Sequence, residues 1–493
     1  MIPRVLKFFL MAAALVAPGL LAGCATAPAT GRTFFTGGMS AEDEARLGRQ
    51  QHEKIVPQFG GVYENAELGI YVASIGNLLV RTSEIPNQKF TFTVLDSPIV
   101  NAFALPGGYV YVTRGLLALT GSEAEMAGVL AHEIGHVAAR HAAERYGQTM
   151  AANLAGAGLG VLLGNKAISN TFASASAVVL RGFSREQEYE ADLLGVRYLT
   201  RAGFDANAMA GFLTKLQADS RLAAEIAGQS GGGDEFNIMQ THPRTVDRIK
   251  RAIAQAGAVT AQNPTRNPIV GRDVFLGKID GMLYGDNPDQ GFIRGRKFLH
   301  PRLRFTFTVP DGFRLANSSQ RVFARGPEGA GIIFDRAREP GTGTMSAYLT
   351  QAWAKGVTLQ NVEAITINGM AAATGQVTVS GRGGQRDLRL IAIRYDQGAV
   401  YRMLFATPPK LTASLSLALR ETTYSFRKLS AAEAAALKPW RLTLHKVRLG
   451  ETAAKLAARM PFSDYRLQRF LVLNGLSETT PLPVGGTVKL IVE

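Results

Sequence analysis

The sequence predicts a multidomain fold: a mainly α-helical domain with a small β-sheet, then an α+β domain, then a small C-terminal module. Its 493 residues exceed what one hydrophobic core usually holds and correspond to roughly three domains of ordinary size. Hydrophobic residues make up 46% of the chain and charged residues 19%, which excludes a largely disordered protein. Helical patterns prevail up to about residue 257, and alternating strand patterns follow from about residue 297.

The first 23 residues have the features of an export signal. Two basic residues precede an apolar run, Phe8 to Leu21, that is short for a membrane-spanning helix. The run ends in Leu21-Ala22-Gly23-Cys24, which resembles the lipobox of bacterial lipoproteins. That resemblance implies cleavage before Cys24, acylation of this cysteine and, with Ala25 following, anchoring in the outer membrane facing the periplasm. The alternative is an uncleaved anchor helix that happens to end near a cysteine.

Charge and cysteine content narrow the choice of partners. The net charge of +15 is spread along the chain without a dense basic run, which favours contact with anionic envelope surfaces and argues against nucleic-acid recognition. Cys24 is the only cysteine, so the chain has no internal disulfide.

The helical domain is predicted at residues 40–257, after a short tether at 24–39. Ser40 and Asp43 form a capping-box-like start of its first helix. Two segments alternate polar and apolar residues, which predicts a small sheet: Lys89 to Leu95 and Tyr109 to Thr113. The predicted helices are Ser40 to Val56, Glu64 to Arg81, Ser122 to Tyr146, Ser184 to Ala202, Asp205 to Leu222, and one opened by Thr241-His242-Pro243.

A connector rich in Gly, Asn and Pro, at 258–296, leads to an α+β domain at 297–430. This domain contains no recognisable catalytic constellation. Its predicted strands are Phe305 to Val309, Ile332 to Asp335, Ala364 to Ile367, Ala373 to Val379, Leu388 to Tyr395 and Val400 to Ala406, with helical patches at Met345 to Trp353 and Leu411 to Arg420.

A histidine pair with the spacing of a zinc site lies inside the helix predicted from Ser122. His132-Glu133-Ile134-Gly135-His136 is an H-E-x-x-H sequence. Residues four apart share one face of a helix, so both imidazoles project together with the carboxylate beside them. The alternative is an ordinary pair of surface or core histidines. The full H-E-x-x-H pattern rarely occurs by chance inside a predicted helix. The pattern predicts His132 and His136 as zinc ligands and Glu133 as the general base.

A catalytic zinc normally has three protein ligands and one position for water, so a third ligand is required. His141 is rejected, because five residues of continuous helix turn its side chain about 140° away from His136. On the later predicted helix, Glu188 and Asp192 share a face, so that one carboxylate can bind metal while the other orients a ligand. Spacing alone does not choose among three glutamates there: Glu186, Glu188 and Glu190.

Several motifs follow one another between Glu42 and Gly257: Asn101-Ala102-Phe103-Ala104-Leu105-Pro106-Gly107-Gly108, His132-Glu133-x-x-His136, Glu188-x-x-Ala191-Asp192, and Thr241-His242-Pro243 followed by Arg248-Ile249. Together they resemble the HtpX-type zinc peptidases, a gluzincin family, and particularly their soluble periplasmic relatives. That resemblance implies a zincin-type fold with one zinc ion per chain, Glu188 as third ligand and Asp192 as the support behind a ligand. It also places His242 near the metal, where it donates to the oxyanion or closes the fourth coordination site and keeps the enzyme latent; a helix cap is the alternative.

The chemistry predicted for such a site is peptide-bond hydrolysis. Zinc lowers the pKa of a bound water toward about 7, and Glu133 removes the proton and passes it to the departing amine. The strand around Asn101, Ala102 and Phe103 can present an edge to which an extended substrate adds by backbone pairing, so we predict a preference for unfolded polypeptide.

The C-terminal module, at 440–493, resembles a LysM domain in three segments: Val447-x-x-Gly450-Glu451-Thr452, Leu473-Asn474-Gly475-Leu476 and Leu482-x-Val484-Gly485. The resemblance implies a β-α-α-β fold and binding of peptidoglycan through residues 445–492. Ala453 stands where a larger apolar residue is usual, and a purely structural or protein-docking module is the alternative.

These features together predict a zinc-dependent endopeptidase of the bacterial envelope that hydrolyses unfolded or misassembled proteins as quality control. Two other functions fit the same sequence. One is a chaperone-like assembly factor with latent protease activity, and the other is a peptidoglycan-binding structural lipoprotein.

Overall fold

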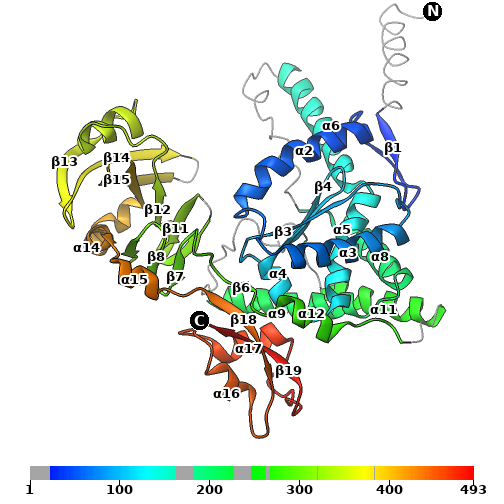
Figure 1. The fold of residues 1–493 in the computed structure, drawn as a ribbon. Coiled ribbons are helices and arrows are strands. Elements are labelled where there is room, and N and C mark those ends of the chain that lie inside the picture. The colour runs from blue at the N-terminus through cyan, green and yellow to red at the C-terminus, as the bar shows by residue number, and fades with distance from the viewer. Residues whose placement is uncertain are drawn as a thin grey trace, which may run out of the picture. The chain divides into compact units, whose positions relative to one another are not determined.

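The computed structural model describes residues 23–162, 182–226, 242, 246–262, 267–318, 320–381 and 384–493. The predicted signal sequence up to Ala22 lies outside these residues, as do Thr241 and Pro243 at the start of the last helix predicted in the helical domain. The chain divides into two compact units. Unit 1 comprises Met1–Val56, Gly61–Met282 and Leu442–Val492, and unit 2 comprises Pro57–Gly60, Leu283–Arg441 and Glu493. The protein therefore has a helical N-terminal region and a later part rich in β-sheet, as predicted (Figure 1).

Unit 1 is built around a three-stranded sheet with the order β3-β5-β4. β3 (Thr91–Leu95) runs parallel to β5 (Tyr109–Thr113), while β4 (Ala102–Leu105) pairs antiparallel with β5 and forms an edge. α3 (Ala66–Thr82) and α5 (Glu123–Ala138) pack on this sheet (Figure 1). The other helices described in unit 1 before the C-terminal module are α2 (Ala41–Gln58), α4 (Arg114–Leu119), α6 (His141–Leu162), α8 (Arg185–Arg201), α9 (Ala208–Ile226), α11 (Val246–Gln262) and α12 (Arg272–Ile279).

α5 and α8 approach closely because glycines lie at their contact. A Cβ atom at Gly135 of α5 would lie 3.0 Å from the carbonyl oxygen of Ala191 on α8. A Cβ atom at Gly195 of α8 would lie 3.2 Å from the backbone nitrogen of His132. The two helices start at serine caps, Ser122 and Ser184, whose hydroxyls accept from the backbone N–H groups three residues later. This contact brings the metal-binding sequence of α5 beside the glutamates of α8.

The helix predicted from Ser122 to Tyr146 is interrupted. α5 ends at Ala138, Arg140 has a φ of 54°, and α6 begins at His141. A non-glycine residue in the left-handed region is strained, and here the Arg140 side chain is held by the carboxylate of Glu44 at 2.6 Å. The prediction was wrong at this point because the sequence contains neither Gly nor Pro there.

The segment predicted as a tether contains two short antiparallel strands, β1 (Cys24–Thr26) and β2 (Thr33–Phe35). Phe34 and Ala27 of this hairpin pack with Ala143 of α6 in a small buried cluster. Cys24 is exposed and is the first residue of β1. The hairpin is thus part of unit 1.

Unit 2 contains a seven-stranded antiparallel sheet, in the order β10-β11-β12-β16-β15-β14-β13, and a four-stranded sheet, in the order β17-β9-β8-β7. Their phenylalanines form the main core, and α14 (Pro409–Ser425) packs on the sheets. The strands of these two sheets are β7 (Phe292–Arg294), β8 (Lys297–His300), β9 (Phe305–Thr308), β10 (Arg314–Asn317), β11 (Arg321–Arg325), β12 (Gly331–Arg336), β13 (Gln360–Ile367), β14 (Met370–Gly381), β15 (Gly384–Asp396), β16 (Ala399–Thr407) and β17 (Arg427–Lys428), with a π-helix, η3 (Tyr348–Trp353), beside them.

The C-terminal segment has the element order β18 (Trp440–Lys446), α16 (Ala453–Ala457), α17 (Arg466–Asn474) and β19 (Thr487–Val492). Residues 442–492 of this segment belong to unit 1, where α17 lies against α9 and α4. Among the helices described here, none combines the length and apolar character needed to cross a membrane.

Candidate metal centre

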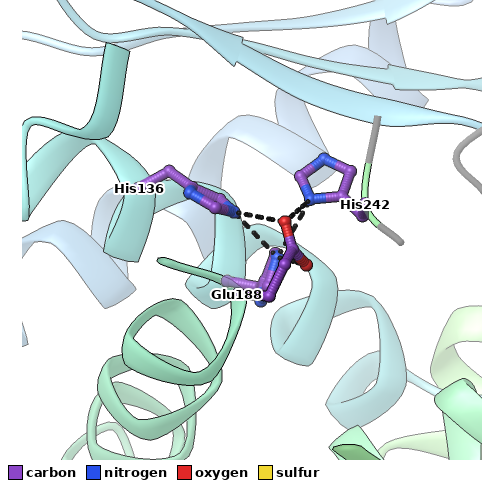
Figure 2. A group of neighbouring side chains, drawn as sticks. His136, Glu188 and His242 are labelled. Carbon is purple, nitrogen blue, oxygen red and sulfur yellow. Dashed lines mark hydrogen bonds and ion pairs between the residues drawn. The ribbon is translucent and has the colours of Figure 1, made fainter. Parts of the chain in front are cut away.

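Four buried side chains of unit 1 converge on one point. His132 and His136 come from α5, Glu188 from α8, and His242 from the segment before α11. One donor atom of each residue lies within 4.8 Å of the donor atoms of the other three. Figure 2 shows the carboxylate of Glu188 between the imidazoles of His136 and His242. All four residues are at most 6% exposed, so the polar atoms face one another and not water.

The distances define which atoms face the common point. The Nε2 atoms of His132 and His136 are 3.0 Å apart, and each lies 3.5 Å from an oxygen of Glu188. Nδ1 of His242 lies 2.9 Å from Oε1 of Glu188 and 3.2 Å from Nε2 of His132. Three imidazole nitrogens and a carboxylate oxygen in this arrangement are ligands that zinc accepts in tetrahedral sites.

Glu133 lies next to this group and is only 1% exposed. Its Oε2 atom has no hydrogen-bond partner among the described residues, and its Oε1 lies 3.4 Å from Nε2 of His242. A buried polar atom without a partner costs free energy, so an oxygen in this place fits a water molecule held at a metal. The residues present therefore fit a catalytic metal ion with a general base beside it.

Burial and neighbouring charges shift the pKa values of the site in opposite directions. Burial raises the pKa of Glu133, although His242 and His132 partly offset it, so this carboxylate is a stronger base than usual. Burial also acts on Glu188, but His242, His132 and His136 outweigh it and hold the pKa well below its usual range. Burial lowers the pKa of His132, yet the hydrogen-bonded Asp192 and Glu188 carboxylates reverse this and raise it to about 10. Glu188 therefore stays ionised, as a ligand must.

A buried arginine supports the site from behind. Nδ1 of His132 lies 2.9 Å from Asp192, which receives two hydrogen bonds from Arg248, at 2.7 and 2.8 Å. The same guanidinium lies 2.5 Å from Oε2 of Glu188. Sequence reasoning noted Arg248 only as part of a family motif and missed this role, for which its position six residues after His242 was the available signal.

The structure separates the three candidate glutamates of α8. Glu188 faces the histidines, whereas Glu186 is exposed at the start of the helix. Glu190 points to His141, at 3.0 Å from its Nε2. Another contact that sequence reasoning missed is Phe183, which stacks on the ring of His136 with 3.8 Å between centroids. The only feature of the sequence that could have indicated this contact is the position of Phe183 directly before the capping serine of α8.

The residues predicted to bind substrate lie at the edge strand β4, but their side chains point inward. Asn101, Ala102 and Phe103 are 1%, 0% and 5% exposed, and Phe103 stacks on Tyr111. Any contact with substrate at this place would therefore use the backbone of the strand.

Comparison with known proteins finds similarities to this region of the chain. Residues 69–256 match the model of peptidase family M48. The "Beta-barrel assembly-enhancing protease" of Yersinia pestis is 37% identical over 192 residues, which cover 37% of each chain. The protein of the same name from Escherichia coli (strain K12) is 32% identical over 192 residues, again 37% of each chain. The "Mitochondrial metalloendopeptidase OMA1" of Schizosaccharomyces pombe is 31% identical over 219 residues, which cover 43% of this chain and 61% of the relative.

The matches concern the region of the candidate metal centre and not the whole protein. The chain covers between 37% and 61% of these relatives' own lengths, and unit 2 lies beyond the family match. Among solved structures, the PsbP protein of Synechocystis sp. PCC 6803 matches 28% of this chain and 98% of its own, with 14% identity and a TM-score of 0.22.

Proposed function

We propose that this chain is a zinc-dependent endopeptidase of the bacterial envelope that cleaves unfolded or misassembled proteins. The observation that supports it most is the buried donor set of His132, His136, Glu188 and His242 with the orphaned Glu133 oxygen beside it. The match of residues 69–256 to peptidase family M48 supports the same class of reaction.

In this proposal His132, His136 and Glu188 hold one zinc ion. When bound, zinc polarises the substrate carbonyl and lowers the pKa of a water molecule. Glu133 accepts the proton of the attacking water, which its raised pKa favours, and then donates it to the leaving amine. An extended substrate would add to the sheet at its edge strand, β4, by backbone pairing, which a folded protein could not do.

His242 gives grounds for a second function, a chaperone-like assembly factor whose protease activity is latent. Its Nδ1 faces Glu188 at 2.9 Å, the position of a fourth ligand, and a zinc ion with four protein ligands has no place for water. Movement of His242 away from the site would open that place, and from there its imidazole can donate to the oxyanion. The other alternative, a purely structural peptidoglycan-binding lipoprotein, leaves the buried donor set without a role.

The cellular setting completes the proposal. Acylation of Cys24 would anchor the protein in the outer membrane, facing the periplasm, and residues 445–492 would bind peptidoglycan as a LysM-like module. The relatives named for β-barrel assembly point to misassembled outer-membrane proteins as substrates. The finer resemblance to HtpX-type peptidases is part of the same proposal.

One experiment tests the reaction. The mature protein should contain about one zinc ion per chain and degrade unfolded casein, and a chelator should stop the degradation. Glu133→Gln keeps the shape of the side chain but does not accept the proton, so turnover should fall by at least about 10²-fold at near-normal zinc content. Degradation by this variant at the wild-type rate would show that the mechanism is wrong.

A further inference from the structure

We propose that His141 is a positioning residue for the metal ligand His136, and that Arg32 of the N-terminal hairpin holds His141 in place through Glu190. The inference rests on the proposed function, because it assigns these residues a purpose only if His136 binds metal. It concerns a part of the chain, the hairpin of β1 and β2, that carries none of the ligands.

The first contact is between two imidazoles. Nδ1 of His136 lies 2.7 Å from Nδ1 of His141, a fully buried residue. His136 turns its Nε2 toward the other donors, so its Nδ1 carries the proton and donates to His141. His141 then accepts at Nδ1 and carries its own proton at Nε2, which lies 3.0 Å from Oε2 of Glu190. Each contact thus fixes the tautomer that the next one requires.

The hairpin closes this chain of contacts at its outer end. Arg32 lies 3.3 Å from Oε2 of Glu190 and makes a two-pronged ion pair with Glu144 of α6, at 2.6 and 2.8 Å. Gln187 of α8 donates to the same Glu144 carboxylate at 2.7 Å. The guanidinium therefore joins the hairpin to α6 and α8 and restrains the oxygen that accepts from His141.

The two histidine ligands are supported in parallel ways. Behind His132, the carboxylate of Asp192 is held by Arg248. Behind His136, the carboxylate of Glu190 is likewise held by an arginine, Arg32. Here His141 lies between the carboxylate and the metal ligand. Partners that orient a metal-bound histidine set its tautomer and ring position, and their loss typically costs about 10–100-fold in metal affinity.

The break between α5 and α6 makes the insertion possible. In a continuous helix the residue five positions after His136 would point away from it. The left-handed conformation of Arg140 instead turns the chain so that His141 lies directly behind the His136 ring. The strained residue therefore has a function in this arrangement.

The test is zinc affinity, measured on the full mature protein by competition with a chromogenic chelator. His141→Leu removes both contacts with an apolar side chain of smaller but comparable bulk, and zinc should bind about 10–100-fold more weakly. His141→Asn keeps a polar atom near the place of Nδ1, so it should recover part of the affinity. Arg32→Met should weaken binding less than His141→Leu does. The absorption spectrum of the cobalt-substituted protein should shift in His141→Leu, because the His136 ring is no longer oriented.

A matched control is Arg402→Met, which removes a two-pronged arginine–carboxylate ion pair, with Asp335 of unit 2, that involves none of the candidate ligands or the residues behind them. It should lower thermal stability without changing zinc affinity. Wild-type zinc affinity in both His141→Leu and Arg32→Met would overturn the proposal. If circular dichroism shows that His141→Leu does not fold, the proposal is judged from Arg32→Met and His141→Asn. Wild-type zinc affinity in both of these variants would then overturn the proposal. A wild-type protein that binds no zinc would instead refute the proposed function.

Discussion

At the scale of single residues, α8 carries three glutamates within five positions, and burial distinguishes them. Glu188 is fully buried between the histidines of α5 and the guanidinium of Arg248, whereas Glu186 is exposed. Ligand loss at Glu188 should therefore lower metal content and activity together, because one of three protein ligands disappears.

We predict that Glu188→Ala loses most of its zinc and its casein-degrading activity, and that Glu186→Ala keeps both. Zinc is measured by mass spectrometry after dialysis, alongside the degradation rate. Glu190 is not used as the neutral control, because it contacts His141. Normal zinc in Glu188→Ala would mean that the third ligand is misassigned, even if the protein is an active peptidase.

Another prediction concerns His300 at the end of β8 in unit 2. Burial lowers its pKa from 6.5 to about 4, and its Nδ1 accepts a hydrogen bond from the backbone N–H of Leu303. Well above pH 6.5 this imidazole is neutral in both the folded and the unfolded state. As the pH falls toward 4, the unfolded state binds the proton first, so the free energy of unfolding decreases, by about 2 kcal/mol at pH 5.

We therefore expect the unfolding transition of unit 2 to move to lower denaturant concentration between pH 7 and pH 5. His300→Gln does not titrate and should reduce this shift. The measurement is denaturant unfolding of the full protein at both pH values, followed by tryptophan fluorescence. An equal shift in His300→Gln and wild type would show that other groups cause the pH dependence.

At the scale of elements, the sequence was sufficient for the parts of the site that depend on local rules. The spacing of His132 and His136, the cap at Ser122 and the alternation in β3 and β5 are all local patterns, and the structure has the corresponding elements. The break at Arg140 depends on a contact with Glu44 that lies 96 residues away in the chain. A contact of that separation leaves no periodic signal.

In unit 2, too, local patterns were predicted from the sequence and long-range contacts were not. Strands with strong alternation, such as β12 and β16, were predicted, whereas β10 and β11 were not. The order of strands in the seven-stranded sheet places β12 beside β16, a pairing between segments more than 60 residues apart. Such pairing is determined by which apolar faces fit together, and that information is not contained in any one segment.

An element-scale prediction follows from Lys489 of β19. This residue is 1% exposed, and its ammonium group donates to three carbonyl groups at the C-terminal end of α4, those of Ala118, Leu119 and Thr120. Carbonyls at a helix C-terminus lack partners within the helix and carry partial negative charge. Lys489→Met would bury them without a donor, so the free energy of unfolding should fall by about 1–3 kcal/mol.

The control is Lys455→Met, which removes an exposed lysine that also donates to a backbone carbonyl, that of Gly450. It should change stability by no more than about 0.5 kcal/mol. Both variants are compared by denaturant unfolding. Equal stability of Lys489→Met and wild type would mean that these hydrogen bonds contribute no net stability.

At the scale of the whole molecule, the C-terminal segment contributes to the same compact unit as the metal centre, although more than 150 residues of unit 2 separate them in sequence. α17, in which Phe470 and Leu471 are buried, lies against α9 and α4, and Lys489 reaches the end of α4. α4 directly precedes α5, the helix of the zinc-binding motif. The segment is therefore expected to stabilise the metal-binding region and not to move as an independent attachment.

We predict that deleting residues 440–493 has two separable effects. Binding to purified peptidoglycan should fall, if the segment is a LysM-like module, and the thermal unfolding temperature of unit 1 should fall because an apolar surface on α4 and α9 becomes exposed. Casein cleavage should persist at temperatures well below that transition, because every predicted ligand and the base lie outside the deleted segment.

Lys489→Met separates the two effects, since it weakens docking on α4 while leaving the rest of the segment in place. It should lower the unfolding temperature in the same direction as the deletion, by less, and leave the pull-down on peptidoglycan unchanged. An unchanged pull-down in the deletion variant would remove the glycan-binding role and leave the peptidase proposal intact. An unfolding temperature of unit 1 that is the same with and without residues 440–493 would show that the contacts of α17 and β19 with α4 and α9 are not maintained in solution.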